Sequence, residues 1–507
     1  SSQNPDAGST IRLRGGSSLL GSNAPLIVVD GFPFGDAGNM KQINTDNIES
    51  VEILKDASAS AIYGSRGANG VILITTKKAK KGETTITVKN QLTASSFAST
   101  LIKHFDPLLM MQISNEGRIN SGLQPYYNGS YSSTGAYYPS LQEVESGAWP
   151  YFTDWASLVL RPQPLTNNTT VTLRSANDKT NYSLSGNFYT QEGVYIKDLY
   201  NKGIISLNID HKVNNKLTIT SSTNVNKNYR NDNTDLAYYR NPLWPVYDEK
   251  GEYYLAGNQD FSNPIAISET QLNRTEGVDI ATSLMSNWQV TKDLEFHGQV
   301  NYRFRESEND RYYPKEYTQT GASNNGAAIC TITRTENLST DAFATYKIPL
   351  NKKHNLSVMG GIDYETYTSI PYNMQAYDFE NETLQNENMA AGNKELNIIN
   401  NTPYTQTKLL SYMFRTNYIF KDKYLATITA RADGSSKFGA NNKWGFFPSA
   451  ALSWKLHYED FIKKLGVFDE FKLRASYGIL GNQGISAYQT LIKYGSDNYY
   501  VNGKCAT

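Results

Sequence analysis

Apolar and polar residues alternate along most of the chain after about residue 84. In 294–305 the even positions hold Leu, Phe, Gly, Val, Tyr and Phe, whereas the odd positions hold Glu, His, Gln, Asn and two Arg. A period of two indicates a β-strand with one apolar and one polar face. With this segment, the pattern predicts about thirteen strands, the others at 84–93, 169–176, 180–190, 203–211, 216–226, 281–290, 329–349, 354–365, 408–420, 423–433, 446–456 and 470–480.

The connectors between these strands differ in length in a regular way. Brief links at 177–179, 213–215, 291–293, 351–353 and 421–422 follow every second strand. Long links occupy 94–168, 191–202, 227–280, 306–328, 366–407 and 434–445, so that short and long connectors alternate without a break in parity. This sorting is typical of outer-membrane barrels, which have tight turns at one rim and extended loops at the other. The alternative, a soluble β-sandwich, has no reason to sort its loops by length.

Charge and aromatic content narrow the function classes. The 507 residues include 48 basic and 48 acidic side chains, so no broad positive field attracts nucleic acid, and we expect no nucleic-acid partner. With 36 Tyr, 19 Phe and 6 Trp, the chain is rich in rings that gather at boundaries between apolar and wet surroundings. No apolar run approaches the roughly 18 residues of a membrane helix. The polar N-terminal stretch carries no secretory signal, which we expect to be removed or to lie outside this sequence.

Metal, thiol and nucleotide chemistry have no matching motif. The two cysteines, Cys330 and Cys505, lie far apart, and the five histidines are scattered, so we predict neither a metal site nor a cofactor. The glycines at 64, 67 and 70 precede the predicted strand 71–76, whereas a phosphate-binding fingerprint follows a strand and opens a helix. The glycines are therefore interpreted as packing devices, which permit positive φ and close backbone approach.

Enzyme motifs are also missing from the sequence. There is no G-x-S-x-G or H-E-x-x-H pattern. The neighbouring carboxylates Asp46, Glu49 and Glu52 could suggest glycosidase chemistry, but we interpret them as solvated turn and strand charges. The sequence therefore predicts a protein that is not an enzyme.

Four long blocks resemble the SusC/RagA family of TonB-dependent outer-membrane transporters. They are "PLIVVDGFPF" (25–34), "INTDNIESVEILKDASASAIYGSRGANGVILITTK" (43–77), "RADGSSKFGANNKWGFFPSAALSW" (431–454) and "FKLRASYGILGNQGISAY" (471–488). The resemblance implies a membrane all-β fold, a barrel of about 22 strands whose lumen is filled by an N-terminal α/β plug domain. On this basis residues 1–83 are the C-terminal part of the plug, and residues 84–507 are a barrel that is incomplete at its C-terminal end. Because thirteen strands are too few and no aromatic residue closes the chain, we expect truncation at both ends.

The same resemblance implies a location in the cell outer membrane and a set of partners. These are a SusD-like lipoprotein lid, the TonB–ExbB–ExbD energy-transducing complex and an oligosaccharide substrate, in a dimer of SusCD pairs. The loops 125–140 and 149–155 are rich in Tyr, Asn, Gly and Trp, which suit sugar rings. Membrane-interface or loop packing is the other explanation for these aromatic residues. A RagA-like importer of oligopeptides and a passive surface binding barrel remain alternatives.

Two groups of plug residues are candidates for function. By resemblance, Arg66 seats the plug by reaching acidic side chains on the barrel wall, the alternative being a solvated arginine at a turn. Outward-facing turns at 14–23 and 31–39 are candidate substrate contacts. They offer the rings of Phe32 and Phe34 for stacking and, as polar contacts, Asp36, Asn39, Ser17 and Ser18. The alternative is that a ring packs against the barrel wall, and alternation along the turn predicts that the two rings point in different directions.

Overall fold

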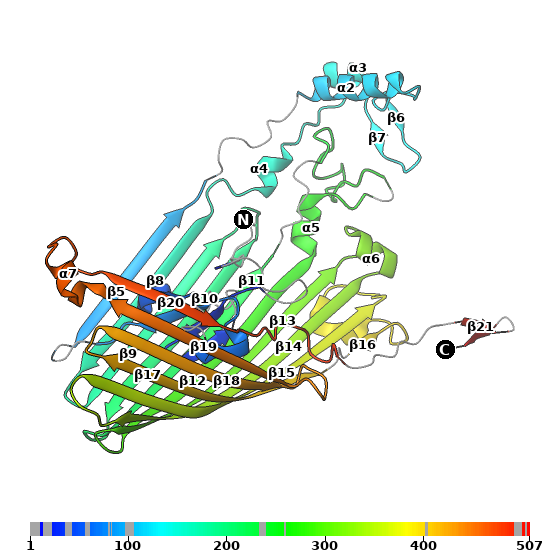
Figure 1. Cartoon of the computed structure of the whole chain (residues 1–507). Helices are drawn as coiled ribbons and strands as arrows, with labels where there is room; N and C mark the ends of the chain where they lie inside the picture. The colour runs from blue at the N-terminus through cyan, green and yellow to red at the C-terminus, as the bar shows by residue number, and fades with distance from the viewer. Residues whose placement is uncertain are drawn as a thin grey trace.

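The computed structural model describes residues 11–13, 23–35, 43–55, 61–79, 82, 84–96, 106–232, 240–257, 260–400, 404–490, 499–501 and 504–506. A 14-stranded sheet curves around a four-stranded sheet formed by the N-terminal part of the chain (Figure 1). The smaller sheet is the plug, and the larger one is the wall of a partial barrel.

The plug sheet has the strand order β2-β1-β4-β3. Its strands are β1 (Leu26–Val29), β2 (Phe32–Gly35), β3 (Ile48–Leu54) and β4 (Val71–Thr76), and the strand predicted at 71–76 is confirmed. β1 runs parallel to β4, and β3 is antiparallel to it. Asp30 and Gly31, with φ of 47° and 85°, make the two-residue turn between β1 and β2. Positive φ at both positions is what a tight hairpin of this type requires, and Asp-Gly tolerates it.

The plug has a small apolar core of its own. One cluster consists of Ile27, Phe32, Phe34, Ile43, Ile72, Ile74 and Ala281, of which only Ala281 comes from the barrel wall. A second cluster of Leu26, Val28 and Val71 lies on the other face of the sheet. The buried apolar residues of these two clusters therefore pack mainly against one another rather than against the wall.

The wall confirms the predicted strands and the predicted fold class. Each predicted strand is present, and each pairs antiparallel with its neighbours in sequence order. The strands are β5 (Thr85–Ala94), β8 (Leu165–Ala176), β9 (Thr180–Glu192), β10 (Leu199–Lys212), β11 (Leu217–Asn231), β12 (Leu272–Gln289), β13 (Leu294–Tyr313), β14 (Ala327–Ile348), β15 (His354–Tyr377), β17 (Thr405–Phe420), β18 (Tyr424–Ser435), β19 (Trp444–Lys455) and β20 (Lys472–Gly478). The short β16 (Ile398–Asn400) pairs with β15 beside this path.

Several strands extend well beyond their predicted ends. β12 begins at Leu272 rather than 281, β13 ends at Tyr313 rather than 305, and β15 ends at Tyr377 rather than 365. On the outer face of β13, the apolar Phe304 is followed by the charged Glu306, which forms an ion pair with Arg334 on β14. Because both faces of the strand are polar beyond that point, the alternation that marks a strand disappears although the hydrogen-bonded ladder continues. The predicted long connectors at 227–280, 306–328 and 366–407 are therefore shorter in the structure.

The long connectors lie at one rim, where they form helices and small hairpins (Figure 1). The first holds α2 (Pro107–Asn120), β6 (Ser130–Tyr131), β7 (Tyr137–Tyr138), α3 (Leu141–Glu145) and α4 (Trp155–Val159), and later ones hold α5 (Pro264–Thr270), α6 (Gln319–Asn324) and the 3-10 helix η4 (Gln385–Ala391). The turn at 177–179 is as short as predicted. No helix in the described part of the chain is both long and apolar enough to cross a membrane.

The predicted parity of connector lengths is wrong at one place. Residues 456–471, between β19 and β20, lie at the short-turn rim but form η5 (Leu456–Tyr458) and α7 (Asp460–Lys463). Glu459 explains why this longer connector is stable there. Its carboxylate accepts hydrogen bonds from Lys423 at 3.0 Å and from Tyr424 at 2.9 Å, both at the neighbouring short turn. The separate two-stranded sheet of β21 (Tyr499–Val501) and β22 (Lys504–Ala506) follows the last wall strand.

Candidate functional site

Arg66 ends the plug's 3-10 helix η3 (Ala61–Arg66) and faces two carboxylates on β15. Its guanidinium lies 3.1 Å from Asp363 and also pairs with Glu365. Burial alone would lower the pKa of Arg66, but the nearby carboxylates raise it above its ordinary value, so the group stays charged. The plug arginine therefore does meet acidic side chains of the wall, and its role in seating the plug is taken up below as a proposal.

Arg431 on β18 extends this ion-pair network within the wall. It lies 2.8 Å from Asp363 and 2.6 Å from Asp433, and it is 1% exposed. Asp433 in turn accepts a hydrogen bond of 2.8 Å from the backbone N–H of Ser65. A continuous chain of charges thus joins η3 to β15 and β18. Sequence reasoning did not identify these wall residues, which lie about 300 positions or more from Arg66.

Gly64 shows why this turn needs a glycine. It has φ of 52°, and a Cβ there would overlap Asp433 and would lie 2.7 Å from Cδ of Arg431. Gly70 also has positive φ, and a Cβ there would lie 2.8 Å from Leu13. Both positions fit the interpretation of the glycines as packing devices, because neither tolerates a side chain in this conformation.

A second polar contact holds the other end of the plug sheet. Asp46, in the 3-10 helix η2 (Thr45–Asn47), pairs with Lys89 of β5 and accepts a hydrogen bond of 3.0 Å from Thr170 of β8. Burial alone would raise the pKa of Asp46, but these two partners lower it below the usual value. The prediction that Asp46 is a solvated charge is therefore wrong, whereas Glu49 and Glu52 are exposed as expected.

Phe32 and Phe34 do not point in different directions. Their ring centroids lie 5.2 Å apart with an interplanar angle of 83°, and both rings are buried in the plug core. The prediction is wrong because the segment is strand β2 rather than a projecting turn, and residues two apart on a strand share a face. This placement supports the anchoring alternative over stacking on a substrate.

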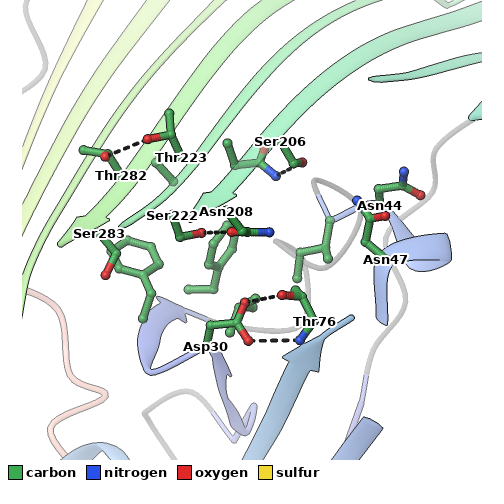
Figure 2. A pocket seen from close by; sticks show the side chains of 16 residues that line it. Asp30, Asn44, Asn47, Thr76, Ser206, Asn208, Ser222, Thr223, Thr282 and Ser283 are labelled. Atoms are coloured by element: carbon green, nitrogen blue, oxygen red, sulfur yellow. Dashed lines mark hydrogen bonds between the residues drawn. The ribbon is translucent and has the colours of Figure 1, made fainter. Parts of the chain in front are cut away.

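A pocket of about 50 Å³ lies between these rings and the wall (Figure 2). Polar side chains of β10, β11 and β12 line its upper side, where Asn208 accepts a hydrogen bond of 2.6 Å from Ser222. Below them, the Asp30 carboxylate accepts hydrogen bonds from the backbone and hydroxyl of Thr76. This volume holds a few water molecules but is far below the roughly 300 Å³ of a small-molecule site.

Two larger cavities separate the plug from the wall. One, of about 640 Å³, opens near the short-turn rim and is lined by Lys77, Lys78, Lys179 and Lys212 among others. The other, of about 570 Å³, lies toward the long-loop rim. It is lined by Phe34 and Arg66 from the plug and by residues of β13, β14 and β15. Both have the volume of a ligand site. We call the second one the arginine cavity, because Arg66, Arg303 and Arg305 line it.

The remaining predicted contacts, Asp36, Asn39, Ser17 and Ser18, lie outside the residues that the structure describes. Of the two predicted substrate contacts that the structure describes, Phe34 lines the arginine cavity and Phe32 does not. Arg303 and Arg305 were missed by sequence reasoning, because on an alternating strand they look like ordinary polar positions of the inner face.

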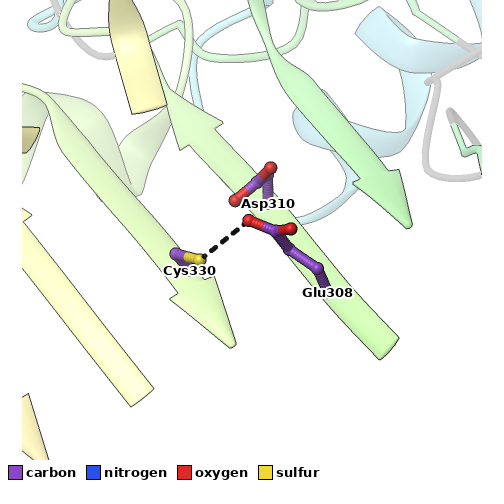
Figure 3. A group of neighbouring side chains, drawn as sticks. All are labelled: Glu308, Asp310 and Cys330. Atoms are coloured by element: carbon purple, nitrogen blue, oxygen red, sulfur yellow. Dashed lines mark hydrogen bonds between the residues drawn. The ribbon is translucent and has the colours of Figure 1, made fainter. Parts of the chain in front are cut away.

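Glu308, Asp310 and Cys330 form the one group among the described residues whose ligand atoms lie within 4.8 Å of one another (Figure 3). Cys330 donates a hydrogen bond of 3.7 Å to Glu308. Asp310 is already ion-paired with Arg274 at 3.0 Å. With one carboxylate thus neutralised, the geometry carries no metal assignment, and the predicted lack of a metal site stays a prediction.

The aromatic residues of the first long loop mostly pack against one another. Tyr137 lies 4.9 Å from Tyr131 and 5.1 Å from Trp149, measured between ring centroids. A hydrogen bond from its hydroxyl to Glu143 raises the pKa of Tyr137 to about 12. Loop packing thus explains several of these rings, while Tyr131 remains 74% exposed.

Comparison with known families assigns both parts of the chain. The TonB-dependent receptor plug domain family matches residues 1–71, and the TonB-dependent receptor-like β-barrel family matches residues 210–504. Receptor P26 of Formosa agariphila, a TonB-dependent receptor, is 32% identical over 98% of this chain and 50% of its own length. SusC of Bacteroides thetaiotaomicron, also a TonB-dependent receptor, is 28% identical over 95% of this chain and 48% of its own length.

Solved structures share the fold. The RagAB peptide transporter matches 98% of this chain and 58% of its own with a TM-score of 0.80 and 21% identity. The ferric citrate transporter FecA matches with a TM-score of 0.52 and 10% identity, over 95% of this chain and 57% of its own. The chain spans about half the length of the curated relatives it matches. The plug-in-barrel architecture and the two family matches confirm the predicted resemblance: the chain belongs to the TonB-dependent receptor family.

Proposed function

We propose that the chain forms part of an outer-membrane importer that takes up oligosaccharides by TonB-dependent transport. The observation that carries this proposal is a separate plug sheet inside the wall, which meets the wall through the ion pairs of Arg66 and Asp46 and shares one described wall residue, Ala281, in its apolar core. A passive binding barrel needs no such insert, whereas an importer must close a wide lumen until energy is supplied. In this proposal Arg66 seats the plug.

Deletion of the TonB system tests the energy coupling. Uptake of the substrate should collapse in the deletion strain while binding to the cell surface persists, because affinity alone moves no bulky solute past a seated plug. Equal uptake rates in the two strains would contradict the importer proposal and favour the passive binding barrel.

The proposed partners are a SusD-like lipoprotein lid and the TonB–ExbB–ExbD complex, in a dimer of receptor–lipoprotein pairs. Support for a lid comes from α2 in the first long loop, where Ile113 is 53% exposed and Ile119 is 59% exposed. Apolar side chains exposed in one helix suit a protein partner. Ile113→Glu with Ile119→Glu should remove the lipoprotein from the purified complex. Val467→Glu, at an exposed apolar position near the short-turn rim, is the matched control and should leave it bound.

Oligosaccharide is proposed over oligopeptide because the long loops combine aromatic rings with amides and hydroxyls. The peptide alternative has its own support in the likeness to the RagAB peptide transporter, but at 21% identity that likeness concerns the fold alone. Competition between a set of oligosaccharides and a set of peptides for the purified receptor distinguishes the two. Binding of peptides only would overturn the oligosaccharide proposal.

Asp36, Asn39, Ser17 and Ser18 are proposed as plug contacts to the substrate, while the burial of Phe32 and Phe34 makes these two rings anchors. Asp36→Ala should weaken substrate binding without changing the stability of the plug. A substrate held wholly by loops or lid, with Asp36→Ala binding normally, would remove the plug turns from the recognition site.

A further inference from the structure

Among the described residues that line the arginine cavity, one arginine has no ion pair or hydrogen bond. Arg305 lies on β13 two residues after Arg303, so both side chains point to the inner face of the wall. No ion pair or hydrogen bond joins Arg305 to another described residue, although it lines a cavity of about 570 Å³. A guanidinium carries five N–H donors and is charged at every physiological pH.

The other charged groups of the cavity are already engaged. Arg303 donates to both carboxylate oxygens of Asp279, at 3.0 and 2.6 Å, and to the backbone oxygen of Phe34 at 2.8 Å. Glu365 accepts from Arg66 with one oxygen and from Asn337 with the other. Among the described residues that line the cavity, Glu365 is the one acidic residue, and both of its oxygens already accept hydrogen bonds.

The neutral lining suits a polar ligand. Ser307, Thr333 and Thr335 provide hydroxyl groups that can donate or accept, and Tyr367 provides a ring. Thr335 is the direct cross-strand neighbour of Arg305. A planar guanidinium beside hydroxyl groups matches a planar or tetrahedral oxyanion, which it can bind through two parallel N–H···O bonds.

We infer that the arginine cavity binds an oxyanion, a carboxylate or a sulfate ester, carried by the oligosaccharide, with Arg305 as its principal contact. This inference rests on the proposed oligosaccharide import and specifies the substrate class as acidic sugars. Arg303 and Arg66 hold the cavity open by fixing Phe34 and Glu365, and Arg305 recognises the charge.

Two ligand pairs test the inference on the intact receptor by isothermal titration calorimetry. The first pair is trigalacturonic acid and its fully methyl-esterified form, and the second is a sulfated oligosaccharide and its desulfated form. In the native receptor at least one acidic member should bind more tightly than its neutral partner. Arg305→Gln should weaken that acidic member about 10- to 100-fold, the range for losing a charge-assisted hydrogen bond. The same variant should leave the neutral partner within about twofold.

Arg334→Gln is the matched control. Arg334 lies on the adjacent strand β14 but pairs with Glu306, is 45% exposed and does not line the cavity. It removes the same charge and should leave both affinities unchanged. Arg305→Lys keeps the charge but loses the paired geometry, and should give an intermediate affinity. A urea midpoint of plug unfolding equal to that of the native receptor would show that the Arg305→Gln variant is folded.

The outcomes separate this inference from the proposed function. Three results would each overturn the inference. The neutral sugars could bind as tightly as the acidic ones, neither acidic sugar could bind, or Arg305→Gln could bind the acidic sugar with unchanged affinity. If neutral oligosaccharides bind, the proposal of oligosaccharide import stands even though the inference about acidic sugars fails. Binding of a tripeptide with a free carboxylate, but of no sugar, would overturn both the inference and the oligosaccharide proposal. The affinity of the same tripeptide with an amidated C-terminus then shows whether the receptor recognises the carboxylate. Loss of the preference for the acidic sugar in Arg305→Gln alone would support the inference.

Discussion

Arg66→Gln should detach the plug from the wall at lower denaturant concentration. The substitution leaves Asp363 and Glu365 in place, with side chains 10% and 20% exposed, but removes the cation between them and the plug. Breaking a buried ion pair by removing one partner costs about 3–5 kcal/mol. Because Arg431 still neutralises Asp363 at 2.8 Å, we expect the lower end, about 3 kcal/mol, in the free energy of plug unfolding.

The assay is a urea titration of the intact receptor in detergent, with trypsin cleavage of the plug as the readout. With a urea slope of about 1–3 kcal/mol per M, a loss of about 3 kcal/mol lowers the midpoint by about 1–3 M. The wall strands, which form a continuous hydrogen-bonded sheet, should keep their protease resistance at these concentrations.

Two further variants make the result specific. Arg12→Gln removes an exposed plug arginine and should leave the midpoint unchanged. Adding Glu365→Gln to Arg66→Gln removes one of the stranded carboxylates and should recover part of the loss. An Arg66→Gln midpoint equal to that of Arg12→Gln would refute the reasoning that the network seats the plug.

Three further predictions use the same urea assay. Gly64→Ala should lower the midpoint, because its φ of 52° is strained for alanine and the added Cβ displaces Arg431, together costing at least about 1–3 kcal/mol. Phe32→Ala should cost about 3–5 kcal/mol of plug stability, as buried Phe truncations do, and a small effect would show that the ring is not an anchor. Asp46 has a lowered pKa, so its pairing stabilises the plug above about pH 4 and is lost as the pH falls below that value. Asp46→Asn should therefore lower the free energy of plug unfolding at pH 7 by less than about 1 kcal/mol, since its lysine partner is half exposed, and its difference from the native receptor should shrink as the pH falls below about 4.

The sequence predicted the wall strands well where one face is apolar and the other polar. It failed at their ends, because β13 has mostly polar residues on both faces beyond Phe304, so the alternation stops although the hydrogen-bonded ladder continues. The connector 456–471 was missed for a different reason: its stability comes from contacts of Glu459 with another turn, and no local pattern reveals such contacts.

The sequence predicted that Arg66 meets acidic residues of the wall, but not which ones. That Arg66 needs acidic partners follows from placing a charge in a narrow interface, but Asp363 and Glu365 are two of many acidic residues on the wall. Which of them meet Arg66 depends on strand register and barrel curvature, which are properties of the whole sheet. The same holds for Arg305, whose lack of a partner among the described residues is visible only once its neighbours are in place.

The polar contact between plug and wall bears on what happens to the lumen when the plug shifts. Among the described residues, Ala281 is the one wall residue in the apolar core of the plug, and ion pairs and hydrogen bonds join the two parts elsewhere. Surfaces of this kind are rehydrated when they separate, whereas apolar surfaces would adhere to each other and to any passing solute. In the proposed importer, a displaced plug would therefore leave a wetted, non-adhesive passage, and its return would require no expulsion of trapped apolar material.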